Sequence, residues 1–154
     1  MTALSKVVAD AFVSQYGSYA EELHKWVDAL SESQFWSNPF PYGNSIGHLV
    51  LHITGNLSYY VGAQVARTGY VRNRDLEFAE SGRPAKAQVM RKFDETIAMV
   101  LATIREQSEA DWTLPYSGER DTESKDRFAM FLRCAAHMYH HIGQINYLSR
   151  ELSK

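Results

Sequence analysis

Apolar residues recur every three or four positions through most of this chain, and this spacing constrains the fold more than any other feature. Between residues 3 and 30 the series consists of Val8, Phe12, Tyr16, Tyr19, Leu23, Trp26 and Leu30. Because an α-helix repeats about every 3.6 residues, these side chains share one side of a long amphipathic helix. The turn-forming segment 37–44 (SNPFPYGN) predicts where this helix has to end.

The same periodicity predicts three more helices. The second has Asn44 or Ser45 as its N-cap and runs to about Thr68, the third begins with Pro84, and the fourth begins near Thr122. The sequence carries no β-hairpin signal. Four helices of about 20 to 28 residues predict an all-α protein with the architecture of a four-helix bundle.

The predicted connection between the second and third helices, residues 69–84, is long for a bundle loop. It is long enough to travel the length of the bundle, so the second and third helices could run parallel. Long connections in compact domains often carry function, which makes this one a candidate lid or site wall. A chain of 154 residues fits one domain, and we expect residues 1–154 to form a single bundle domain.

Composition excludes several classes of function. The 16 Lys and Arg against 18 Asp and Glu give a net charge of −2, which offers no broad basic surface for nucleic acid or a membrane. The single cysteine, Cys134, cannot form an internal disulfide, so no oxidising compartment is required. The N-terminal segment lacks the apolar core of a signal peptide, and no stretch has the length and apolarity of a membrane span. We therefore expect a cytoplasmic protein.

Four of the six histidines form two pairs with helical spacing, His48 with His52 and His137 with His141. Residues four apart lie on one face of a helix, so each pair can direct two imidazoles at one point. Neutral imidazole binds Zn, Ni, Cu and Fe, and bundle cores commonly hold metals between facing helices. One pair alone would be explained more simply by hydrogen-bonded imidazoles, whereas two pairs favour a metal site. His24 has no such companion and is expected on a helix surface.

Residues 45–53 (SIGHLVLHI) and 137–145 (HMYHHIGQI) resemble the DinB/YfiT-like proteins, and residues 72–78 (RNRDLEF) resemble an uncharacterised subgroup of that superfamily. The resemblance covers nearly the whole chain in length and helix order. It implies a four-helix bundle with the helix order up-down-down-up, which agrees with the long second connection. It also implies a metal-dependent enzyme and a homodimer, because bundles of this family are often dimers.

The resemblance further implies which histidines bind the metal. Matched position by position, the ligands are His52, His137 and His141, whereas the family pattern does not demand histidine at position 48. Three ligands leave a vacancy for water or substrate, while four would close a tetrahedral site. The expected cofactor is a divalent metal, with Zn or Ni preferred and Fe, Mn or Cu as alternatives, because a three-histidine set accepts several ions.

Neighbouring residues are candidates for contacts just outside the coordination sphere. His48, Asn56, His140 and Gln144 could orient a ligand or contact the substrate. For the two amides, helix packing or capping is an equally good explanation. Cys134 lies on the ligand face of the fourth helix and could supply a thiolate, although a small buried apolar residue is its commoner role.

The long connection contributes three charged candidates for catalysis, Arg74, Asp75 and Glu77. An arginine would suit an anionic substrate, and a carboxylate could serve as a general base. The alternative is a local ion-pair network that pins the connection to the bundle.

An open three-histidine site makes two reactions accessible, because a divalent ion can lower the pKa of bound water toward about 7 or bind and deprotonate a thiol. The resemblance implies the same two activities, a hydrolase or a thiol S-transferase. The expected partner is a small-molecule substrate such as a low-molecular-weight thiol. The alternatives are a non-catalytic metal-binding or stress-related bundle module, and a bundle used only for dimerisation.

Overall fold

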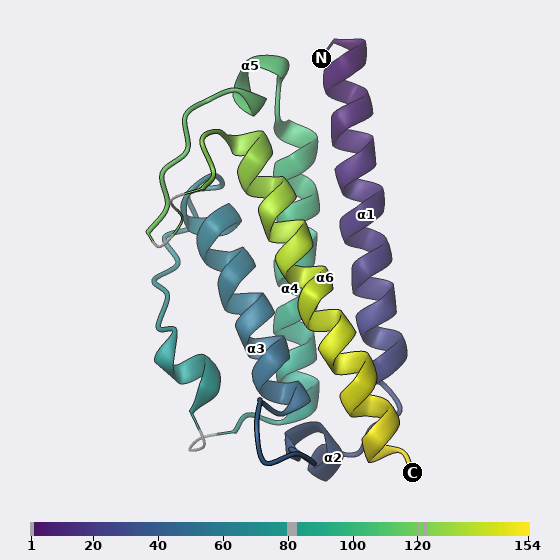
Figure 1. The fold of residues 1–154 in the computed structure, drawn as a ribbon. Coiled ribbons are helices and arrows are strands. Elements are labelled where there is room, and N and C mark those ends of the chain that lie inside the picture. Colours follow the sequence, from purple (N-terminus) through teal and green to yellow (C-terminus); the bar gives the residue numbers. More distant parts are fainter. Residues whose placement is uncertain (1, 80–82, 120, 122) are drawn as a thin grey trace.

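The computed structural model describes residues 2–79, 83–119, 121 and 123–154, and four long helices dominate it (Figure 1). They are α1 (Ala3–Val27), α3 (Ile46–Leu57), α4 (Lys86–Glu106) and α6 (Arg127–Leu152). A π-helical segment, η1 (Ser58–Ala63), extends α3. The described residues contain no named strand, so the predicted all-α class is confirmed.

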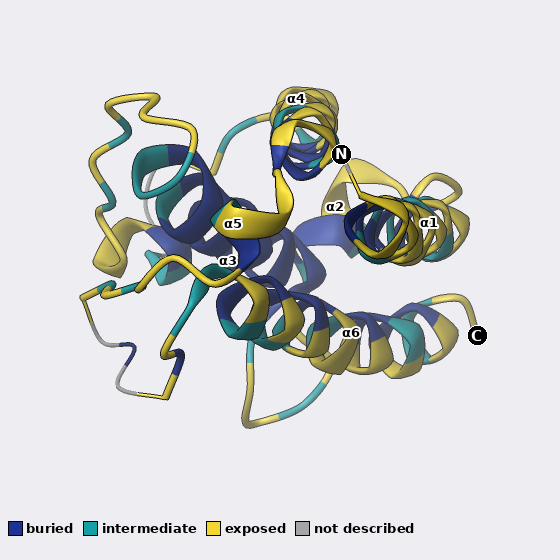
Figure 2. Ribbon diagram, turned by 90° about the horizontal axis from the view of Figure 1, so that it is seen from above, coloured by how far each residue is buried: buried dark blue, intermediate teal, exposed yellow. Residues whose placement is uncertain are grey.

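The four long helices run in the order up-down-down-up (Figure 1). α3 is antiparallel to α1, α4 runs parallel to α3, and α6 is antiparallel to both α3 and α4. The connection 64–85 allows the parallel pair because the part of it that the structure describes passes back along the side of the bundle (Figure 1). α1 and α3 each pack on α4 and α6 and therefore occupy opposite corners (Figure 2). The predicted bundle and its helix order are confirmed.

Each long helix turns its buried face toward the bundle axis (Figure 2), and most of the buried residues are apolar. All four helices contribute side chains that are almost completely buried, among them Tyr16, Leu23, Ile53, Leu57, Phe93, Ile104, Phe131 and Ile142. Burying one such side chain stabilises a fold by about 1.5–3 kcal/mol, so this core is the main support of the site described below. None of the described helices combines the length and apolar character needed to cross a membrane.

The first helix ends earlier than its apolar stripe predicts. α1 stops at Val27 rather than at Leu30, and a short helix, α2 (Glu32–Trp36), follows it. Ser31 begins α2 with a capping box, in which its hydroxyl and the side chain of Gln34 each accept a hydrogen bond from the other residue's backbone. This local hydrogen bonding ends the long helix before the periodic apolar residues do.

Three other predicted boundaries are also displaced. The second helix ends with η1, short of Thr68, and the third begins at Lys86 rather than at Pro84. The fourth begins at Arg127, because the side chain of Asp126 caps it by accepting from the backbone of Ala129. Its predicted start, Thr122, lies outside the described residues. A further one-turn helix, α5 (Glu109–Trp112), precedes it.

The described part of the connection 64–85 contains a 3₁₀ turn, η2 (Asp75–Phe78), which packs against α3. Gly55 of α3 permits this close approach, since a Cβ atom there would lie only 2.2 Å from Oε1 of Glu77. Glu77 is buried, whereas Asp75 and Leu76 of the same turn are exposed. The connection therefore presses one carboxylate against the middle of α3.

Candidate metal centre

Three histidines from two antiparallel helices converge between α3 and α6. Nε2 of His137 lies 3.1 Å from Nε2 of His52 and 3.1 Å from Nε2 of His141. Two nitrogens that each lie about 2.0–2.1 Å from one tetrahedral ion are ~3.3–3.4 Å apart, which is close to this spacing. The described residues thus include a group of three imidazoles that could hold one metal ion.

Two charged residues of the connection fix the ring of His52. Its Nδ1 donates to Oε2 of Glu77 over 2.7 Å, which leaves the lone pair on Nε2 for the cluster. Arg72 holds the same carboxylate twice, with Nε 2.7 Å from Oε1 and Nη2 2.8 Å from Oε2. Burial opposes the charge of Glu77, but the hydrogen bonds from His52 and Arg72 lower its pKa, so it is a carboxylate.

The side-chain amide of Gln144 orients the ring of His141 in the same way. Nδ1 of His141 donates to Oε1 of Gln144 over 2.7 Å, so its Nε2 also presents a lone pair to the cluster. The amide nitrogen of Gln144 lies 3.4 Å from Nε2 of His140 and donates to it. His140 therefore stays outside the cluster and contacts it through this amide and through the ring of His141, whose centre lies 5.0 Å from its own.

His137 lies between the other two rings, and its pKa is strongly lowered. Burial, followed by the neighbouring rings of His141 and His52, lowers its pKa to about 3. Burial is also the main cause of the lowered pKa of His141. Because His52 and His141 carry their protons on Nδ1, the three Nε2 atoms share at most one proton. That many lone pairs in so small a space suit a bound cation.

His48 and Cys134 lie outside the cluster. Nε2 of His48 donates to the carbonyl of Ala79 over 3.1 Å, and its Nδ1 accepts from the hydroxyl of Ser45 over 2.9 Å. The four-histidine arrangement that spacing left open is therefore not formed, and His48 instead ties the connection to the start of α3. Cys134 is buried beside Met130, and burial raises the pKa of its thiol to about 12, as expected for a buried apolar residue.

The three charged candidates of the connection occupy different surroundings. Glu77 is buried against His52, whereas Arg74 and Asp75 are exposed. The guanidinium of Arg74 lies 5.3 Å from the ring centre of Phe78, and that ring lies 4.9 Å from the ring centre of His52. The structure thus brings one of the three into contact with a histidine of the cluster and leaves two at the surface.

Sequence reasoning did not single out two arginines as site residues, Arg72 and Arg133. Arg133 lies one turn before His137 on the same face of α6, and that spacing was the available signal. Arg72 carries no comparable signal, because its role depends on how the connection folds. Asn56, one turn after His52, is buried, and its Oδ1 has no hydrogen-bond partner among the described residues.

An open polar pocket of about 530 Å³ adjoins the cluster on the side of the connection. It is lined by Tyr59, Tyr60, Tyr70, Val71, Arg72, Asn73, Arg74, Asp75 and Glu119. Arg72 joins the pocket to the cluster, since its Nη2 lies 3.5 Å from Nδ1 of His52. None of the three histidines lines this pocket, and Arg72 is the lining residue that connects it to His52.

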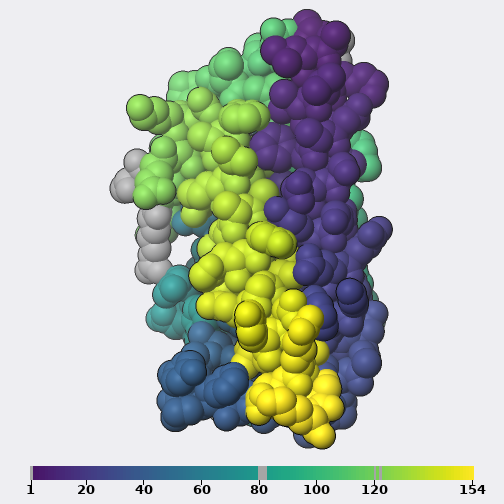
Figure 3. All heavy atoms as spheres, turned by 45° about the vertical axis from the view of Figure 1, so that its right-hand side comes forward, coloured from purple at the N-terminus to yellow at the C-terminus, as the bar shows by residue number. Residues whose placement is uncertain are grey.

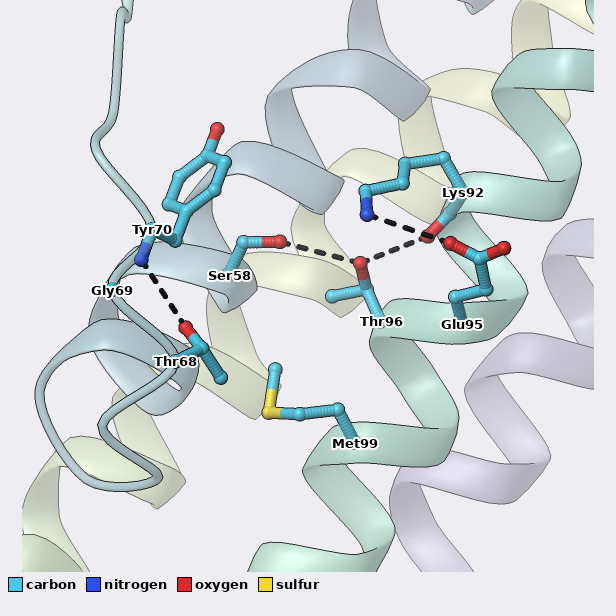
Figure 4. A pocket seen from close by; sticks show the side chains of 8 residues that line it. All are labelled: Ser58, Thr68, Gly69, Tyr70, Lys92, Glu95, Thr96 and Met99. Carbon is cyan, nitrogen blue, oxygen red and sulfur yellow. Dashed lines mark hydrogen bonds and ion pairs between the residues drawn. The ribbon is translucent and has the colours of Figure 1, made fainter.

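A smaller pocket of about 270 Å³ lies between the end of α3 and α4 (Figure 4). Its floor carries a hydroxyl pair, Ser58 and Thr96, with 3.2 Å between the oxygens, and its rim carries Lys92 and Glu95. Arg72 of the polar pocket bonds to Glu77 and lies 3.5 Å from Nδ1 of His52, whereas none of the residues that line the smaller pocket bonds to Glu77 or to the three histidines, so the polar pocket is the one nearer the candidate site.

An all-α bundle with three converging imidazoles defines a class of helical proteins equipped to hold a metal ion. The model of the DinB superfamily matches residues 17–145, and the chain belongs to this superfamily. The crystal structure of a DinB-like protein from Bacillus cereus ATCC 10987 has the same fold, with a TM-score of 0.72 at 14% identity over 92% of this chain and 91% of that chain. No curated protein matches the sequence.

Proposed function

We propose that this protein is a metal-dependent enzyme in which His52, His137 and His141 hold one divalent ion, with Zn or Ni preferred. The proton arrangement carries the proposal. Hydrogen bonds to Glu77 and Gln144 fix the Nδ1 protons of the outer two rings, so their Nε2 lone pairs meet at His137. Lone pairs this close repel one another unless a cation lies between them.

A divalent ion bound there would act as a Lewis acid and lower the pKa of a water or thiol that it binds. The chain's own contribution is geometry. Glu77, held by Arg72, keeps the ring of His52 in one tautomer and orientation, and Gln144 does this for His141. We infer hydrolysis or thiol transfer on a small molecule that enters through the adjoining polar pocket.

Metal content tests the site. Protein purified without chelators is compared with His137→Ala and with His24→Ala, which removes a histidine outside the cluster. Elemental analysis is expected to find one ion per chain in the wild type and in His24→Ala, and none in His137→Ala. Equal metal content in all three proteins would contradict the proposal.

Activity tests the enzyme. The metal-loaded protein is assayed for conjugation of small thiols to a chromogenic electrophile and for ester hydrolysis, with His137→Ala as the control. We expect turnover that requires His137. A fully loaded wild type with no activity above this control would favour the non-catalytic module instead.

We also infer a homodimer that buries one face of α1 and α6. These helices lie side by side (Figure 3), and a groove of about 400 Å³ between them is lined only by uncharged residues. Val7 and Leu132 on this face are 64% and 55% exposed. A symmetric contact between two copies would bury them. Light scattering should find a wild-type dimer and a Leu132→Lys monomer, and a monomeric wild type would contradict the inference.

A further inference from the structure

Arg133 carries a positive charge on the same face of α6 as His137 and His141. It lies one turn before His137 on α6, and residues four apart on a helix are neighbours on its surface. Its guanidinium carbon lies 4.3 Å from the ring centre of Tyr60, which belongs to η1. Tyr60 also lines the polar pocket beside the cluster. Arg133 therefore lies one helical turn from His137 and in contact with a residue that lines the pocket.

The guanidinium of Arg133 is held in place from one end. Its Nε donates to Oδ2 of Asp121 over 2.9 Å. The side chain of Asp121 is 1% exposed, and its Oδ1 accepts from the backbone of Ser124 over 3.0 Å and of Glu123 over 3.2 Å. A buried, fully bonded carboxylate on one side and the Tyr60 ring on the other fix the orientation of the guanidinium.

The other end of Arg133 is available. Apart from a 4.0 Å contact between Nη2 and Sγ of Cys134, its two terminal nitrogens have no hydrogen-bond partner among the described residues. The side chain is 26% exposed, so a ligand can reach it. Arg72 differs, because it uses both Nε and Nη2 on Glu77. The guanidinium of Arg133 is thus held in one orientation while its terminal nitrogens keep hydrogen-bond donors that a ligand can use.

The charge balance of the site favours an anion. Three neutral imidazoles would leave the charge of a divalent ion uncompensated. The charge of Glu77 is balanced by Arg72, and that of Asp121 is balanced by Arg133 itself. A loaded site would therefore carry an excess positive charge beside the free nitrogens of Arg133. A substrate with a negative group would neutralise it.

We propose that Arg133 binds a carboxylate of the substrate while the reacting group of the same molecule lies at the three histidines. The two terminal nitrogens of a guanidinium match the two oxygens of a carboxylate. The substrate class is then a small carboxylic acid that carries a thiol or a hydrolysable bond. This inference rests on the proposed metal site and adds the residue that selects the substrate.

The test uses the cobalt-loaded protein, because a thiol bound to Co²⁺ gives a near-ultraviolet absorption band that reports binding without turnover. Thiols of two to five carbons are titrated as matched pairs, each with a terminal carboxylate or a terminal hydroxyl. We expect the acid of the best length to bind about tenfold more tightly than its alcohol, as for a charge-assisted hydrogen bond. Cobalt affinity is measured separately.

Three variants test whether Arg133 causes the preference for acids over alcohols. Arg133→Met should abolish the preference and leave the affinities for cobalt and for the alcohols unchanged, and Arg133→Lys should retain part of it. Arg74→Met, which removes the exposed arginine of the connection, should retain it in full.

Equal binding of acids and alcohols by the wild type, or no response to any acid, would overturn the role of Arg133 and leave the metal site standing. A preference that survives in Arg133→Met, or is lost in Arg74→Met, would overturn it too. A wild type that binds no cobalt would refute the proposed function, and with it this inference. If Arg133→Met fails to fold, Arg133→Lys decides, because full retention of the preference in a folded Lys variant would show that the guanidinium is not the selector.

Discussion

At the scale of single residues, the orientation of His52 depends on a carboxylate that lies 25 positions away in the sequence. Glu77 accepts from Nδ1 of His52 and is itself held by two nitrogens of Arg72. Groups that orient a metal ligand commonly contribute about 10- to 100-fold in metal affinity. The affinity of the site should therefore depend on Glu77 although it does not touch the point where the three rings converge.

We expect Glu77→Gln to lower the affinity for Zn²⁺ by about 10- to 100-fold, because a neutral amide holds the His52 proton less strongly and leaves Arg72 without its counter-charge. Competition with a chromophoric chelator measures the affinity. Asp75→Asn is the matched control, since it removes an exposed carboxylate from the same turn. Equal zinc affinities for the two variants would show that Glu77 has no such role.

Gly55 should be indispensable for the same contact. A methyl group there would overlap Oε1 of Glu77, whereas a Cβ at Gly17 of α1 meets nothing within 4 Å. Replacing an interior helical glycine by alanine normally stabilises by about 0.5–1 kcal/mol, which we expect for Gly17→Ala. Gly55→Ala should instead lose stability and weaken zinc binding, as measured by urea unfolding and chelator competition. A Gly55→Ala protein as stable as Gly17→Ala would contradict the close approach.

The sequence identified the three converging histidines because their helical spacing and the motifs that carry the family resemblance are contained in short stretches of sequence. It also named Glu77, as one of three catalytic candidates, but could not separate it from Arg74 and Asp75. Which of them turns inward depends on a single 3₁₀ turn and on the room beside Gly55. Arg133 carried a spacing signal, four residues before His137, but its contact with Tyr60 depends on how η1 and α6 pack.

At the scale of elements, periodicity predicted the four long helices because each buries one continuous stripe, and the length of the second connection indicated the parallel pair. The two short helices were missed. Each is set by a capping box, with Ser31 and Gln34 at α2 and with Ser108 and Asp111 at α5. Such hydrogen bonds act over four residues and leave no trace in the apolar period.

One contact between elements should make stability depend on pH. His24 of α1 lies 2.7 Å from Asp94 of α4 and 2.9 Å from Asp28. Although partial burial opposes protonation, the hydrogen bonds to these carboxylates raise the pKa of His24 above its usual 6.5. The folded protein therefore binds this proton more tightly than the unfolded chain does, and stability should fall as the pH rises through the folded pKa.

Urea unfolding of the metal-free protein checks this at about pH 5.5 and about pH 8.5, on either side of the histidine range. The wild type should be more stable than His24→Gln at the lower pH, and the difference should shrink at the higher pH. A difference that is constant or grows with pH would mean that the protonated ring does not link α1 to α4.

At the scale of the whole molecule, the cluster joins α3 to α6, so an ion bound there should stabilise the bundle as a whole. A ligand that binds only the folded state at 100 times its Kd contributes about 2.7 kcal/mol. For a domain of about 150 residues this corresponds to a rise in Tm of roughly 5–10 °C. Calorimetry of the metal-free wild type with and without Zn²⁺ should show the rise, and EDTA should reverse it. His137→Ala should show little change because it lacks the central ligand, and a similar rise in that variant would place the stabilising zinc elsewhere on the chain.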